Sequence, residues 1–131
     1  MKIKYLGTAA AEGWPALFCG CPSCQMAREL GGKNIRTRAQ AVVDGRLLID
    51  FGPDTYLHVI RDGLKLHEIN HCIVTHGHCD HFYATDLMMK ARPYAQSGSA
   101  RRFMSMEQSG SGNCINACGM WMTTVKIWMT V

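Results

Sequence analysis

The chain has 131 residues, of which 47% are hydrophobic and 18% charged, and its formal net charge is +4 at pH 7. This length and balance predict one domain with a modest core, and they exclude an intrinsically disordered chain. No apolar run is long enough to span a membrane and no signal peptide is evident, so we expect a cytoplasmic protein.

The residues before position 95 show the alternation of strands and helices that is typical of an α/β fold. Four short apolar strands are predicted, at residues 3–6, 39–43, 46–49 and 69–75. Asp44 and Gly45 predict a tight hairpin between the second and third strands. The basic segment 33–38 lacks interleaved aromatic residues, which favours a solvated loop over a nucleic-acid-binding surface.

Two helices are predicted from the spacing of apolar residues. The first covers residues 53–62 and is expected to end at Gly63. The second covers residues 82–92, and Leu87 and Met88 are the side chains that we expect it to pack against the core.

Three of the seven cysteines lie close together in the sequence Cys-Gly-Cys-Pro-Ser-Cys, at positions 19, 21 and 24. Three thiolates on a tight Gly/Pro loop fit three corners of a tetrahedral structural zinc site, with a fourth ligand from elsewhere. Disulfides within so short a loop would be strained, and free surface thiols would be a liability. Zinc binding by Cys19, Cys21 and Cys24 is therefore the favoured interpretation.

A second cluster of metal-type ligands follows the last predicted strand, in the sequence Thr-His-Gly-His-Cys-Asp-His at residues 75–81. This loop holds half of the six histidines of the chain. His76 and His78 can converge on one ion, while Asp80 and His81 can face a second ion about 4 Å away. Imidazole and carboxylate suit zinc, and manganese or iron also stays open. A loop that binds nothing is the weaker alternative, because the spacing of the histidines and the aspartate allows their side chains to converge on metal ions.

These motifs resemble the metallo-β-lactamase superfamily. The loop 75–81 is similar to its T-H-x-H-x-D-H signature, and residues 47–52 resemble its strand that ends in an aspartate beside the site. Two further motifs narrow the resemblance to one branch of the superfamily: the cysteines and the sequence Gly-Thr-Ala-Ala-Ala-Glu-Gly-Trp-Pro at 7–15. That branch includes the phosphodiesterase acting on phosphoribosyl 1,2-cyclic phosphate. The resemblance covers residues 1–95 and implies an α/β fold, the N-terminal half of an αββα sandwich.

The resemblance also implies a function and a set of site residues. It implies a metal-dependent hydrolase, with a small cyclic phosphodiester as the first-choice substrate and a hydroxide activated by two metals as the nucleophile. Hydrolysis of a thioester, a lactone or RNA stays open as an alternative reaction. No nucleic-acid or membrane partner is expected. A homodimer is neither required nor excluded. Two divalent ions, zinc or manganese, would be held by His76, His78, Asp80 and His81, and one structural zinc by Cys19, Cys21 and Cys24.

Two aspartates receive more specific roles from the resemblance. Asp80 is the candidate catalytic residue, because it can also orient the nucleophile; a bridging aspartate from the second half of the family fold is the alternative for that role. Asp50 would fix the orientation of a loop histidine through a hydrogen bond. A plain turn residue before Gly52 is the alternative interpretation of Asp50.

The residues after position 95 lose this pattern, because 96–112 are rich in Ser and Gly and 113–131 cluster Met, Cys and Trp without periodicity. No histidine follows His81, although members of the family complete both metals with ligands from their second half. A fourth ligand for the cysteines is also missing, and Cys114 and Cys118 are weak substitutes.

The sequence therefore predicts a partial domain over 1–95 and an atypical, poorly ordered tail over 96–131. In a shifted reading frame, residues 100–107 permit a plausible strand, so we hypothesise a frameshift near residues 96–100, with a natural truncation as the competing explanation. An inactive fragment that at most binds metal is the alternative to the enzyme.

Overall fold

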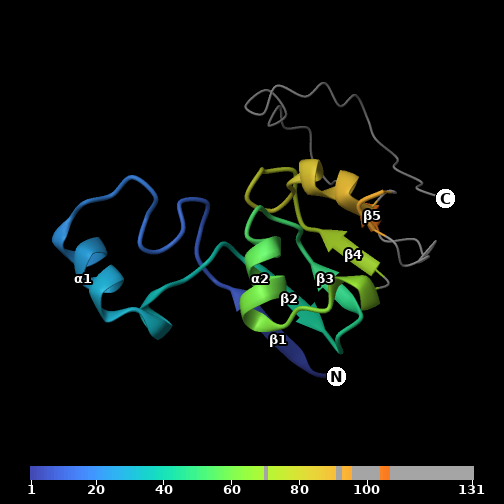
Figure 1. The fold of residues 1–131 in the computed structure, drawn as a ribbon, viewed down its shortest axis with the longest axis horizontal. Helices are drawn as coiled ribbons and strands as arrows, with labels where there is room; N and C mark the ends of the chain where they lie inside the picture. The colour runs from blue at the N-terminus through green and yellow to red at the C-terminus, as the bar shows by residue number, and fades with distance from the viewer. Residues whose placement is uncertain (70, 91–92, 96–103, 107–131) are drawn as a thin grey trace.

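In the computed structural model the described residues are 1–69, 71–90, 93–95 and 104–106, so most of the predicted tail at 96–131, including Cys114 and Cys118, lies outside them. Five strands form one sheet in the order β1-β2-β3-β4-β5: Ile3–Gly7, Gln40–Val43, Leu47–Ile49, His71–Val74 and Met104–Met106. The pairs β1–β2 and β2–β3 are antiparallel, whereas β3–β4 and β4–β5 are parallel. The predicted α/β fold is confirmed (Figure 1).

The predicted hairpin joins β2 and β3. Asp44 and Gly45 both have positive φ angles, 48° and 67°, in the turn between the two strands. Such turns match the right-handed twist of the strands they join, and Asp-Gly is a favoured sequence for them.

Two α-helices are present in the described chain, α1 (Pro22–Leu30) and α2 (Thr55–Asp62). The prediction of a helix at 53–62 is confirmed by α2, which ends at Gly63 in the left-handed conformation with φ 68°. We did not predict α1, because we interpreted its first residues as part of a cysteine-bearing loop. Its sequence signal is Pro22, since proline is favoured in the first turn of a helix.

Three 3-10 helices complete the described chain: η1 (Gly32–Asn34), η2 (Leu66–Glu68) and η3 (Ala84–Lys90). The α-helix predicted for 82–92 is η3 instead. Leu87 is buried at 9% exposure, but Met88 is 59% exposed, so the expectation that Met88 packs against the core is wrong. A 3-10 helix repeats every three residues, so the side chain next to a buried one turns away from the core.

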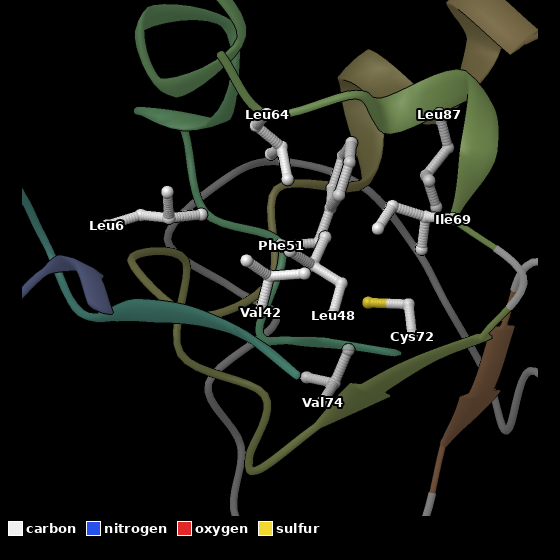
Figure 2. Close-up of a cluster of buried hydrophobic side chains, with 9 residues drawn as sticks. All are labelled: Leu6, Val42, Leu48, Phe51, Leu64, Ile69, Cys72, Val74 and Leu87. Atoms are coloured by element: carbon white, nitrogen blue, oxygen red, sulfur yellow. The ribbon is translucent and has the colours of Figure 1, made fainter. Parts of the chain in front are cut away.

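One hydrophobic core lies against a single face of the sheet. Figure 2 shows its nine buried side chains: Leu6, Val42, Leu48, Phe51, Leu64, Ile69, Cys72, Val74 and Leu87. Strand β4 alternates between the two faces, with Cys72 and Val74 buried and His71 and Ile73 exposed. The described residues therefore form one layer of sheet with helical cover on one side.

Helix α1 lies apart from the sheet at the end of a long excursion of the chain (Figure 1). The outgoing and returning segments pair with each other where the excursion begins. The backbone amides of Thr8 and Ala9 donate to the carbonyl of Thr37 at 3.0 and 2.8 Å, and Trp14 and Arg36 exchange hydrogen bonds of 2.9 and 2.6 Å. We call residues 8–38 the arm. No helix in the described ranges is long and apolar enough to cross a bilayer.

Candidate metal centre

The histidine loop, residues 75–81, begins at one edge of the sheet. Strands β3 and β4 are parallel, so the residues that follow them, Asp50 and Thr75, meet at that edge. The backbone amide and the hydroxyl of Thr75 both donate to Asp50 Oδ1, each at 2.8 Å. The start of the loop is therefore tied to the end of β3.

The second carboxylate oxygen of Asp50 contacts a loop histidine. Asp50 Oδ2 lies 2.7 Å from His81 Nδ1. An ionised carboxylate only accepts hydrogen bonds, so Nδ1 carries a hydrogen, and in the neutral ring Nε2 is the nitrogen that offers a lone pair to a metal. A histidine whose second nitrogen donates to a carboxylate in this way is the usual arrangement for a metal ligand.

The predicted ligands of the loop lie in two close pairs. His81 Nε2 is 3.2 Å from Asp80 Oδ2, and His76 Nε2 is 3.0 Å from His78 Nδ1. Two ligands bound to one ion at 2.0–2.2 Å lie roughly 3 Å apart, so the spacing within each pair fits one ion. A cation placed between His81 Nε2 and Asp80 Oδ2 would be stabilised by both atoms.

The two pairs are close to each other. The ring centroids of His76 and His81, one from each pair, are 4.0 Å apart. Asp80 is buried, His81 is partly buried, and His76 and His78 are exposed. The loop thus presents an imidazole pair to solvent above a more enclosed Asp-His pair.

A turn at residues 50–52 supports the loop through backbone contacts. The amide of Phe51 donates to the carbonyl of His81 at 2.8 Å. A Cβ atom on Gly52 would lie 2.1 Å from the carbonyl oxygen of Asp80, so only glycine fits there. Asp50 itself has a φ of 65°, a left-handed conformation that few residues other than Gly, Asn and Asp adopt.

Sequence reasoning missed a group of polar side chains beneath this turn. Gln40, Thr55 and His58 are buried and hydrogen-bonded to one another. The available signal was a polar residue at the first position of an otherwise apolar strand, together with Thr and His three residues apart on the core-facing side of a helix.

The cysteines form a second candidate centre at the N-terminus of α1. The sulfur atoms of Cys19, Cys21 and Cys24 all lie within 4.8 Å of one another, and within the described residues this is the one set of three or more donors that meets that limit. Sulfur atoms bound to one zinc at 2.3 Å are roughly 3.8 Å apart, a spacing that lies within this limit. Arg28 and Gln25 of α1 hold the cysteine loop: Arg28 donates to the carbonyls of Ala16 and Cys19 at 3.0 and 2.9 Å, and Gln25 to that of Gly20 at 2.8 Å.

The surroundings of the cysteine cluster favour a thiolate at Cys21 and oppose one at Cys24. Hydrogen bonds from the backbone of Cys24 and from the side chains of Cys19 and Cys24 together lower the pKa of Cys21 to about 7. The backbone of Ala16 lowers the pKa of Cys24, but burial and the neighbouring thiols outweigh it and raise that pKa. The thiolate is the form that binds metals. The cysteine cluster, Cys19, Cys21 and Cys24, could therefore hold a metal ion.

Comparison with known proteins identifies related sequences. The chain is 30% identical over 112 residues to the coenzyme PQQ synthesis protein B of Methylobacterium radiotolerans, a match that covers 76% of this chain and 37% of that protein. The same protein of Bradyrhizobium diazoefficiens is 27% identical over 106 residues, covering 72% of this chain and 34% of that protein. The chain thus spans about a third of the length of these curated relatives.

Two solved structures are similar to the described fold. A diphosphatase of the PhnP family matches with a TM-score of 0.58 and 27% identity, over 79% of this chain and 40% of that chain. The Zn²⁺-bound PqqB from Methylobacterium extorquens matches with a TM-score of 0.57 and 26% identity, over 78% of this chain and 36% of that chain. The PhnP-family match agrees with the branch that the motifs predicted.

The family follows from the sequence match. Residues 41–113 match the metallo-β-lactamase superfamily, a stretch that includes the histidine loop and continues past position 95 to include β5. The division of the chain at residue 95 stays a prediction. Since the match covers more than half of its residues, the chain belongs to the metallo-β-lactamase superfamily.

Proposed function

We propose that the histidine loop is this chain's share of a metal-dependent hydrolase site for small phosphodiesters, with cyclic phosphodiesters as the first choice. The observation that carries the proposal is the placement of His81 between two carboxylates. Its Nδ1 lies 2.7 Å from Asp50 Oδ2 and its Nε2 lies 3.2 Å from Asp80 Oδ2. One carboxylate orients the ring, and the other shares with it the position where a cation is stabilised.

Each loop residue has a role in this proposal. His76 and His78 hold one ion, while Asp80 and His81 hold the other. When bound, two divalent ions, zinc or manganese, supply a hydroxide nucleophile at neutral pH and offset negative charge on the phosphoryl oxygens. Asp80 also orients the nucleophile, because its carboxylate is buried and fixed beside His81.

The relatives support this chemistry. One similar structure is described as a diphosphatase, which supports hydrolysis at phosphorus as the reaction class. Another is described as Zn²⁺-bound, which supports zinc as the metal. At the cysteine cluster we propose one structural zinc that stabilises the arm.

A metal-binding fragment without turnover is the second candidate. One observation favours it: the histidine loop offers two ligands to each ion. A catalytic zinc ordinarily has three protein ligands, so the affinity of a two-ligand site is reduced.

Metal content and phosphodiester hydrolysis distinguish the two candidates. The full chain is loaded with zinc or manganese, the metal bound per chain is measured, and hydrolysis of bis-(p-nitrophenyl) phosphate is followed. An enzyme should bind about two ions in addition to the cysteine-bound zinc, and its turnover should be lost on chelation and in Asp80→Asn. His67→Gln, which changes an exposed histidine outside the loop, is the matched control. Metal binding without turnover would support the fragment and contradict the hydrolase.

A further inference from the structure

A chain of buried polar side chains lies beneath the 50–52 turn, outside the residues assigned to metal binding. Its members come from three parts of the fold. Thr37 is at the end of the arm, Gln40 begins β2, and Thr55 and His58 are on α2; all four are buried. Burial of so many polar groups is costly unless each is hydrogen-bonded.

The direction of each hydrogen bond follows from the partners. Gln40 Nε2 lies 2.9 Å from the backbone carbonyl of Asp50, which can only accept, so the amide nitrogen faces Asp50 and Oε1 faces His58. His58 Nδ1 therefore carries a hydrogen and donates to Gln40 Oε1. Its Nε2 lies 2.7 Å from the hydroxyl of Thr37, whose single hydrogen is shared between this nitrogen and the backbone carbonyl of Leu6 at 3.2 Å. Burial lowers the pKa of His58, in agreement with this neutral ring.

At the other end of this hydrogen-bonded series, Gln40 and Thr55 each donate to a backbone carbonyl of the 50–52 turn. Gln40 Nε2 also donates to Thr55 Oγ1 at 2.8 Å, and the hydroxyl of Thr55 donates to the carbonyl of Gly52 at 2.7 Å. The carbonyl groups of Asp50 and Gly52, at the two ends of the turn, are thus both hydrogen-bonded to buried side chains. Within the described residues, no buried side-chain nitrogen or oxygen lacks a hydrogen-bond partner.

The 50–52 turn holds the histidine loop in place. Rotation of its peptide groups would move the Asp50 carboxylate, which binds Thr75 and His81, and would move Gly52 against Asp80. We propose that His58, acting through Gln40 and Thr55, is a positioning residue that fixes this turn and thereby sets the metal affinity of the histidine loop. The inference deepens the proposed function and rests on it for the role of the loop.

Cobalt titration of the full chain tests the effect on affinity. His58→Leu removes both ring nitrogens, whereas His58→Asn keeps an N–H group near the position of Nδ1. Loss of a group that supports a metal ligand costs roughly 10–100-fold in affinity, so His58→Leu should weaken loop binding by roughly tenfold or more, and His58→Asn should recover part of the loss. The thiolate-to-cobalt charge-transfer band reports the cysteine cluster as an internal reference, and the cobalt bound after that band has saturated reports the loop.

Two further variants separate positioning from loss of stability. Val59→Ala truncates the neighbouring residue of α2, which packs against the core and has no part in the polar chain, so loop affinity should stay unchanged. Thr55→Val keeps the shape of the side chain and removes its hydroxyl, so it should weaken loop binding even if His58→Leu fails to fold.

Amide hydrogen exchange in the metal-free protein tests the same inference without any metal. The Thr75 amide is bonded to Asp50 Oδ1, and the Phe51 amide to the carbonyl of His81. Both amides should exchange faster in His58→Leu and Thr55→Val than in Val59→Ala. If the wild-type loop binds no cobalt, the proposed function fails, but the exchange rates still decide the inference. Exchange and affinity equal to those of Val59→Ala would overturn it.

Discussion

The cysteine cluster and the histidine loop both take their ligands from short continuous stretches, but their geometry is held in different ways. Arg28 fixes the cysteine loop through carbonyls only 9 and 12 residues away, within the arm itself. Asp50 fixes the histidine loop through Thr75 and His81, 25 and 31 residues away. The geometry of the cysteine site therefore follows from local sequence, whereas the geometry of the histidine loop depends on the pairing of β3 with β4 at the edge of the sheet.

The strongest test of this difference is removal of one thiolate. Cys24→Ser replaces a buried thiol of the proposed metal site by a hydroxyl that does not ionise, so metal affinity at the cluster should fall by more than about 100-fold. Binding at the histidine loop should not change. Cobalt titration measures both sites, and Cys79→Ser, which changes an exposed thiol, is the control. Loss of metal from the loop as well would show that the two regions are coupled.

The corresponding change at the sheet edge is Asp50→Asn. An amide nitrogen facing His81 would require Nδ1 to accept, which places the hydrogen on Nε2 and removes the nitrogen that is free for a metal. We expect loop affinity to fall roughly 10–100-fold and the cysteine cluster to be unaffected. Asp44→Asn is the matched control, because Asp44 also has a positive φ but lies in the β2–β3 hairpin. Equal affinities in the two variants would refute the role of Asp50.

A backbone contact gives a third test. In Gly52→Ala the new Cβ meets the Asp80 carbonyl oxygen at 2.1 Å, so either the turn or the loop must shift. The free energy of unfolding should fall by about 1–3 kcal/mol, and loop affinity should fall with it. Gly77→Ala lies within the loop and has no atom within 4 Å of its new Cβ, so it should cost far less. Urea denaturation measures both; equal costs would contradict the close approach.

Much of the fold follows from local signals. The Asp44-Gly45 turn and the stop at Gly63 depend on backbone conformations that few residues adopt, so the residue type alone predicts them. The histidine loop is likewise continuous in sequence. Met88 was misplaced because apolar spacing does not distinguish an α-helix from a 3-10 helix over one or two turns.

The support of the site was beyond sequence reasoning because it depends on distant partners. The ring nitrogens of His58 pair with side chains 18 and 21 residues away. A buried histidine and an exposed one look alike in a helix until those partners are known. The role of Asp50 was expected from the family resemblance alone, and its left-handed backbone was not foreseen.

The smallest predicted effect is on the pH dependence of the free energy of unfolding. It concerns the sheet domain, which contains His58, and not the arm. Burial lowers the pKa of His58 below its ordinary value of 6.5, whereas the arm contains no histidine. Below pH 6.5 the unfolded chain binds a proton that the folded ring resists, so the free energy of unfolding should fall, by about 1.4 kcal/mol per unit of pKa difference. Urea denaturation of the metal-free protein, above and below that pH, measures this. The dependence should shrink in His58→Asn and persist in His67→Asn.

The paired ends of the arm bear on how such a chain can change over evolution. Thr8 and Ala9 contact Thr37, and Trp14 contacts Arg36, so the chain leaves and re-enters the sheet domain at nearly the same point. An excursion with adjoining ends can be lengthened, exchanged or lost without altering the strands on either side. The arm can therefore vary in length and sequence while the sheet and the edge that carries the histidine loop stay the same.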